Sequence, residues 1–127
     1  MTEPDTIARI RQSMRRAIGD AVRREAKKAA KGKPAAKVTV TLDQLMAKLS
    51  ANGYRCAVTG LPFWQDDADI SYRPTSPSLD PIKHDGDYSG KNTRVVLHGV
   101  NSIRGRGSDA DMLRIAKAIV RRGRARR

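Results

Sequence analysis

The sequence is poor in cysteine, in aromatic residues and in long apolar runs. Its single cysteine, Cys56, excludes an internal disulfide framework and any zinc site built from several thiolates. No apolar run approaches the roughly 18 residues of a membrane span, and the N-terminus lacks the apolar stretch of a signal peptide. We therefore expect an intracellular, soluble protein that does not bind membranes.

Acidic residues are scarce at both ends of the chain. Residues 1–37 contain 11 basic and 4 acidic side chains, and residues 104–127 contain 9 basic and 2 acidic ones. Residues 38–103, between them, contain 6 basic and 7 acidic side chains. The net charge of +13 therefore comes from the two ends. Such ends attract a polyanion, because binding releases its condensed counterions. A solubilising surface is the alternative, although it would normally interleave both signs.

The aromatic content of 4% bears on which polyanion is bound. One Phe, one Trp and three Tyr form no regularly spaced platform, so recognition of single strands by base stacking is disfavoured. We expect duplex DNA as the partner, contacted largely through its phosphates, while a basic RNA-binding or ribosome-associated protein stays an alternative.

Apolar spacing predicts two helices in the first half of the chain. Residues 4–31 carry isoleucine, methionine and valine at three- or four-residue intervals, with Arg and Lys on the other faces. This helix ends in a basic segment broken by Gly32 and Pro34, which we expect to be a flexible linker. Thr41 can cap a second helix that ends at Asn52 and Gly53. The narrow stripe of the first helix could dock on the core or pair two chains as a homodimer.

The second half of the chain predicts shorter elements. Residues 54–64 are typical of a hairpin of two short strands with a turn at Thr59 and Gly60, and residues 65–78 are expected to be loop. Asn92 can cap a turn or helix that carries Val95, Val96 and Val100 inward. Ser108 can cap a last helix, followed by the basic tail RRGRARR, which we expect to be disordered.

These elements predict an α+β fold in three parts. Residues 1–37 form a basic helical arm and linker, residues 38–107 the core, and residues 108–127 a C-terminal helix and basic tail. The basic residues expected to contact nucleic acid are Arg9, Arg15, Arg16, Arg23, Arg24, Lys27, Lys28, Lys31, Arg94, Arg104, Arg106, Arg121, Arg122 and Arg124.

Four ordered segments give residues 56–104 a resemblance to a known family. These are CAVTG from Cys56, SLDPI around Asp80, GDYSGKN ending at Asn92, and GVNSIRG around Asn101. Together they resemble the HNH nucleases of phage type, in which a β-hairpin and a following helix hold one divalent metal against a scissile phosphate. The resemblance implies a small ββα-metal core with helices on both sides, in the cytoplasm or nucleoid of a bacterial or phage-infected cell.

The resemblance also assigns roles to single residues. It implies that Asp80 and Asn101 bind a divalent metal, Mg²⁺ or Mn²⁺, since hard cations prefer carboxylate and amide oxygens. It implies that Asn92 orients the catalytic loop or the base. The alternative for all three is that they cap turns and helices, as these residue types often do.

The chain departs from the family pattern at two places. Many HNH proteins hold a structural zinc on four cysteines, whose counterparts here are Cys56, Thr59, Leu97 and Val100, so we expect no structural zinc. The general-base histidine that follows the metal-binding Asp is replaced by Pro81, which cannot accept a proton. His84 is the nearest substitute as catalytic base, and an exposed loop histidine is its alternative. The leading hypothesis is a metal-dependent DNA endonuclease, and the alternative is an HNH-fold DNA-binding protein that has lost cleavage and serves in packaging, architecture or regulation.

Overall fold

Six regular elements make up the computed structural model, which describes residues 3–65 and 73–125. They are α1 (Glu3–Ala30), α2 (Leu42–Ala51), β1 (Pro77–Pro81), β2 (Thr93–Leu97), α3 (His98–Arg104) and α4 (Asp109–Ala125). The predicted α+β class is therefore confirmed. In the described part of the chain, no helix combines the length and the apolar character needed to cross a membrane.

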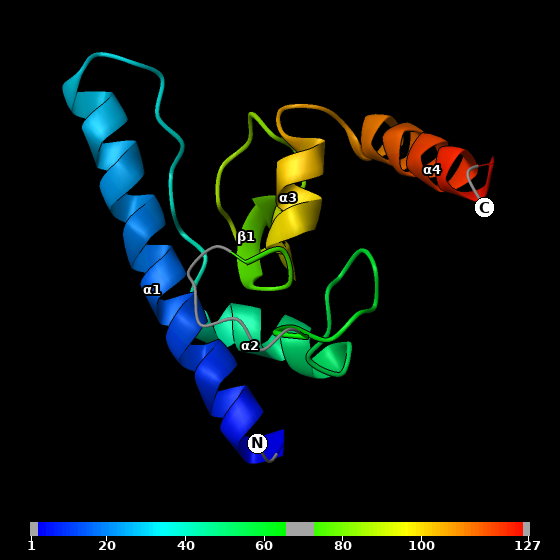
Figure 1. Cartoon of the computed structure of the whole chain (residues 1–127). Helices are drawn as coiled ribbons and strands as arrows, with labels where there is room; N and C mark the ends of the chain where they lie inside the picture. Colours follow the sequence, from blue (N-terminus) through cyan, green and yellow to red (C-terminus); the bar gives the residue numbers. More distant parts are fainter. Residues whose placement is uncertain (1–2, 66–72, 126–127) are drawn as a thin grey trace.

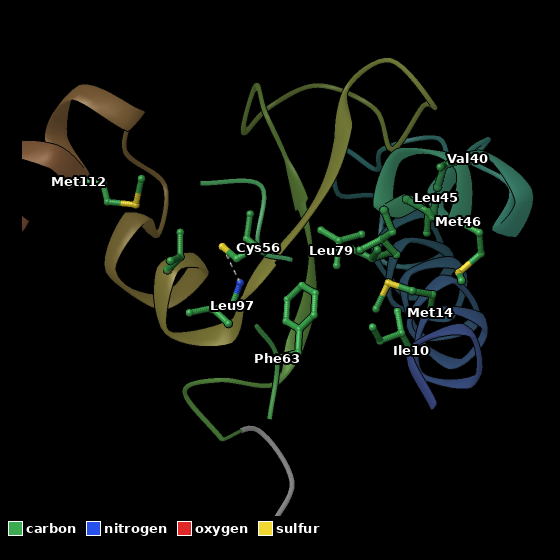
Figure 2. Packing of buried hydrophobic residues seen from close by; sticks show 14 residues of the cluster. Ile10, Met14, Val40, Leu45, Met46, Cys56, Phe63, Leu79, Leu97 and Met112 are labelled. Atoms are coloured by element: carbon green, nitrogen blue, oxygen red, sulfur yellow. Dashed lines mark hydrogen bonds between the residues drawn. The ribbon is translucent and has the colours of Figure 1, made fainter. Parts of the chain in front are cut away.

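The long first helix α1 packs along one side of the core (Figure 1). Its side chains Ile10 and Met14 are fully buried and lie among residues of α2 and β1 (Figure 2). The middle of the apolar stripe is therefore covered within this chain, whereas Val22 near its end is 49% exposed. The first helix shares one hydrophobic core with the rest of the protein instead of forming a separate arm.

The basic segment after α1 is tied down at several points, where a flexible linker was predicted. Glu25 of α1 accepts a hydrogen bond from the Ala36 N–H at 2.9 Å, and the N–H groups of Thr39 and Val40 both donate to the Tyr88 carbonyl. Burial alone would raise the pKa of Glu25, but the Ala36 hydrogen bond and the neighbouring Lys28 and Arg24 charges outweigh it and lower this pKa. The composition of this segment predicts flexibility. It does not show that the buried Glu25 holds the chain after α1 in place.

The capping prediction for α2 is confirmed, while the predicted hairpin is not. Thr41 accepts from the Gln44 N–H, and the Gln44 side chain accepts from the Thr41 N–H, which completes a capping box. Residues 54–64 contain one isolated antiparallel bridge, between Arg55 and Pro62, instead of two strands. Hydrogen bonds from Cys56 N–H to Leu61 O and back from Gly60 N–H to Cys56 O make this segment a tight loop.

The centre of the fold is a two-stranded antiparallel sheet followed directly by a helix. The register pairs Asp80 of β1 with Arg94 of β2. Val95 and Val96 point into the core from β2 and Val100 from α3, so their predicted burial is confirmed although the first two lie on a strand. The order of two strands and a helix is the one that an HNH-like core requires. Many folds contain two strands followed by a helix, so this order establishes a small α+β protein and does not identify an HNH-like core.

The last helix α4 projects away from the body of the molecule (Figure 1). Ser108 Oγ accepts from the Asp111 N–H, as predicted for its cap. The helix continues to Ala125, so residues 121–125, predicted to be disordered, are helical. Of its apolar residues only Met112 is buried, whereas the others are about half exposed: Leu113, Ile115, Ile119 and Val120.

Candidate nucleic-acid interface

A cleft of about 1560 Å³ lies between α1 and a wall made by β1, the turn after it and α3. Its basic lining residues come from α1, from the end of α3 and from chain outside the regular elements: Arg9, Arg16, Arg24, Lys28, Lys33, Arg73, Arg104 and Arg106. Its acidic lining residues are Asp20, Glu25, Asp80, Asp85 and Asp87. These eight basic and five acidic residues leave the lining positive, and three of the acids, Asp20, Glu25 and Asp80, form ion pairs within the protein.

The predicted nucleic-acid contacts divide into two groups. Six of them line the cleft: Arg9, Arg16, Arg24, Lys28, Arg104 and Arg106. The others lie on the outer surface of α1 and just beyond its end, on β2 and on α4: Arg15, Arg23, Lys27, Lys31, Arg94, Arg121, Arg122 and Arg124. The basic residues on one face of α1 therefore line the cleft, and the remaining predicted contacts lie outside it.

Asp80 is enclosed by two arginines. Its side chain is fully buried, Arg94 Nε lies 2.7 Å from its Oδ2, and Arg104 NH1 lies 2.7 Å from its Oδ1. Arg104 also donates from NH1 to the Pro81 carbonyl at 2.9 Å and contacts the Ile82 carbonyl. Each oxygen of the predicted metal ligand is thus engaged by a guanidinium group. As arranged, Asp80 does not fit a metal ion, because the cation would have to replace at least one of these groups.

Both arginines also reach α4. Arg94 donates to the Asp109 carboxylate at 2.7 Å and 3.1 Å, and Arg104 Nε lies 3.2 Å from Asp109 Oδ1. The hydrogen bonds from Arg94 lower the pKa of Asp109, against a smaller opposing effect of burial. Burial would lower the pKa of Arg94, but the hydrogen bonds that Arg94 donates to Asp109 and Asp80 outweigh it and raise this pKa. Arg94 and Arg104, predicted to contact DNA, are thus also engaged in ion pairs with Asp80 and Asp109.

Asn92 holds the turn that carries His84. Its Nδ2 donates to the Asp87 carbonyl at 2.8 Å and to the Lys83 carbonyl at 3.3 Å, and its Oδ1 accepts from the Lys83 N–H at 3.0 Å. Gly86 belongs to the same turn, and a Cβ there would lie 2.8 Å from Asn92 Nδ2. Both readings of Asn92, a turn residue and a residue that orients the loop of His84, agree with these contacts. His84 itself is exposed and lines the cleft.

Asn101 connects α3 to β1 on the same wall of the cleft. Its Nδ2 donates to Ser78 Oγ at 3.0 Å and to the Leu79 carbonyl at 3.1 Å. These bonds use the amide nitrogen, so Oδ1 is the atom with which Asn101 could hold a cation. In residues 3–65 and 73–125, no group of three or more His, Cys, Asp or Glu side chains is placed to hold a metal.

Cys56 lies where the resemblance places one of the four zinc ligands. The buried Sγ accepts a hydrogen bond from the Leu97 N–H at 3.3 Å (Figure 2) and another from the Thr59 N–H at 3.4 Å. Val100 is buried in the same hydrophobic core. Burial raises the pKa of Cys56, but the donors at Thr59, Leu97 and Val58 outweigh it and lower this pKa. Of the four positions that correspond to the zinc cysteines, Thr59 and Leu97 are thus both hydrogen-bonded to the sulfur of the third, Cys56.

Two aromatic residues at the cleft were missed by sequence reasoning. The guanidinium of Arg9 lies over the ring of Trp64, 3.9 Å from its centroid, and Arg24 donates to the Tyr88 hydroxyl at 2.9 Å. All four residues line the cleft. The partners are separated by 55 and 64 positions, and nothing in the local sequence indicates that α1 lies against both rings.

Comparisons with known proteins give no further assignment. A scan against protein-family models, a search of curated proteins and a search of solved structures each found no significant match to this chain. The resemblance to HNH nucleases therefore depends on the four sequence segments alone.

Proposed function

We propose that this protein binds duplex DNA in the cleft between α1 and the wall of β1 and α3, mainly through phosphates. The observation that carries the proposal is the row of Arg9, Arg16 and Arg24 on the face of α1 that lines the cleft. Arg9 and Arg24 are about 22 Å apart along the helix at 1.5 Å per residue. This length matches six or seven nucleotides of one strand at roughly 3.4 Å each.

The burial of α1 changes how this proposal is tested. Deleting residues 1–37 would expose the core around Ile10 and Met14, so a loss of binding would show only a loss of fold. Substitution of exposed arginines leaves this apolar core in place, and circular dichroism checks the fold of each variant because Arg24 also bonds the Tyr88 hydroxyl. The test compares Arg9→Gln, Arg16→Gln and Arg24→Gln, combined in one chain, with Arg11→Gln, Arg15→Gln and Lys27→Gln, which are exposed on α1 and do not line the cleft.

Affinity for a 20-base-pair duplex is measured at several salt concentrations. Each lost phosphate contact reduces the magnitude of the negative slope of log affinity against log salt by about 0.9. This magnitude is therefore expected to fall by about 2.7 in the cleft variant and by much less in the outer variant. Equal losses in the two variants would contradict binding in the cleft. Competition with duplex RNA of equal length tests the RNA alternative.

Metal-dependent hydrolysis of the DNA backbone is the second candidate. The observation in its favour is that Asp80, His84 and Asn101 line the same cleft as the arginines. Pro81 and the two guanidinium groups on Asp80 argue for the binding module without cleavage. Nicking of supercoiled plasmid is measured with Mg²⁺, with Mn²⁺ and with a chelator. Intact plasmid under conditions in which the protein is bound would exclude the hydrolase.

The variant that separates the two functions must keep the fold. Asp80→Ala would leave the buried Arg104 without its carboxylate, at a cost of about 3–5 kcal/mol, so lost activity would be ambiguous. His84→Ala removes an exposed side chain instead. It is expected to abolish nicking if His84 is the base and to leave binding unchanged in either case.

A further inference from the structure

Trp64 occupies an unusual backbone position at one end of the cleft. Its φ is +53°, a conformation that bulky residues rarely adopt and that costs about 1–3 kcal/mol. The Trp64 N–H donates to the Thr75 carbonyl at 2.9 Å, and its ring meets the buried Phe63 edge-on, with centroids 6.5 Å apart. The Gln65 N–H donates to Thr75 Oγ1 at 3.2 Å, so the loop is fixed on both sides of Trp64. The indole itself is only half-buried and lines the cleft.

The Arg9 guanidinium covers the indole from α1. A separation of 3.9 Å between the guanidinium carbon and the ring centroid is a contact distance. Arg9 is exposed, so its guanidinium is accessible from the solvent side. A planar cation held on a ring offers a surface on which a nucleobase can stack, together with N–H donors for the adjacent phosphate.

The second arginine–aromatic pair of the cleft does not offer such a surface. Arg24 is 5.8 Å from the Tyr88 centroid and donates to the Tyr88 hydroxyl. The Tyr88 backbone is engaged by residues 37–40, so this pair fastens the returning chain to α1. Only the end of the cleft at Trp64 combines a close stack with exposure.

We infer that the Arg9–Trp64 stack is a subsite for an unpaired nucleotide of DNA. In a duplex each base face is covered by its neighbours, so only an unpaired, extruded or terminal base can stack on a protein surface. The subsite selects DNA with a single-stranded extension, a substrate class that composition alone argued against. This inference depends on the proposed DNA binding in the cleft and adds a preference among DNA structures.

The test uses the full chain, in which Trp64 is the only tryptophan. Its fluorescence therefore reports on this subsite alone. The probes are a blunt DNA hairpin and the same hairpin with a three-nucleotide 3′ or 5′ extension. We expect quenching of Trp64 by an extended hairpin and not by the blunt one, and at least about fivefold tighter binding of the extended one, since stacking of one base has an effect of this order or larger.

Two variants distinguish stacking from charge. Arg9→Lys keeps the charge and removes the planar surface, so it should abolish the preference for the extension. Because Arg9 also belongs to the proposed DNA-binding row, the readout is the ratio of the affinities for the two hairpins, which should fall to about one. Arg11→Lys, exposed on α1 away from the cleft, should keep the preference. Trp64→Leu, measured with labelled DNA and checked for folding by circular dichroism, should behave like Arg9→Lys.

Failure of the inference and failure of the proposed function give different results. Equal affinity of the wild type for both hairpins would overturn the stacking subsite and leave DNA binding standing. A preference that persists in Arg9→Lys would overturn it as well. No binding to either hairpin would overturn the proposed function and the inference together.

Discussion

At the scale of single residues, Asn92 fixes the turn beside the cleft through both ends of its amide group. In Asn92→Asp an oxygen replaces Nδ2 and faces the carbonyls of Asp87 and Lys83, at 2.8 Å and 3.3 Å in the native protein. We expect a loss of about 1–3 kcal/mol in the free energy of unfolding, measured with urea. In the control Asn52→Asp, the side chain of residue 52 accepts one N–H bond through Oδ1, which a carboxylate keeps, so the loss should be below about 1 kcal/mol.

Asp109 gives the interaction of α4 with the core a dependence on pH. Its pKa is lowered in the folded protein, so it stabilises the fold above its ordinary pKa, and this contribution is lost as the pH falls through the folded value. Asp109→Asn should reduce the free energy of unfolding at pH 7 by about 1 kcal/mol or less, because the side chain is half exposed. The difference from the wild type should shrink as the pH falls below the ordinary aspartate pKa of 3.8 and disappear once Asp109 is protonated in the folded protein. A difference that persists there, or one matched by the exposed control Asp85→Asn, would contradict this role of the ion pairs.

At the scale of elements, α1 has a structural face and a basic face. Met14→Ala should lower the free energy of unfolding by about 2–5 kcal/mol, because the methionine is fully buried between α1 and the core. Val22→Ala on the same helix shortens a side chain that is 49% exposed, so it should change the free energy of unfolding by less than about 0.5 kcal/mol. Equal effects in urea unfolding would mean that α1 is not docked in solution.

The elements show which parts of the structure the sequence could predict. The bounds of α1 and the caps at Thr41 and Ser108 follow from local patterns, and all three are observed. The loop at residues 54–64 was mistaken for a hairpin, because its β-forming residues serve core packing at Cys56 and Phe63 instead of strand pairing. The local sequence pattern indicates that a residue is apolar, but not which residues it packs against in the fold.

The candidate site was predictable only in part for the same reason. Asp80, Asn92, Asn101 and His84 were singled out from ordered motifs, and three of them, Asp80, His84 and Asn101, line one cleft. The enclosure of Asp80 by Arg94 and Arg104 depends on the strand register and on the position of α3. The Arg9–Trp64 stack depends on the docking of α1. Both are tertiary facts that no short motif contains.

At the scale of the whole molecule, positive charge is arranged in two places with different geometry. The cleft holds arginines against a wall, whereas α4 projects from the body with exposed Arg121, Arg122 and Arg124 (Figure 1). Charges outside a binding site mainly steer the approach of a charged partner, and contacts within it mainly slow its dissociation. The two sets should therefore affect different rate constants.

The last prediction separates these two roles by stopped-flow kinetics on a labelled duplex. Arg121→Gln, Arg122→Gln and Arg124→Gln, combined, should lower the association rate constant severalfold at low salt and leave the dissociation rate constant within about twofold, because steering weakens with ionic screening. Arg9→Gln, Arg16→Gln and Arg24→Gln, combined, should instead raise the dissociation rate constant by tenfold or more. If the α4 variant dissociates as fast as the cleft variant, then α4 contacts DNA in the final complex, and the interface extends from the cleft along the projecting helix.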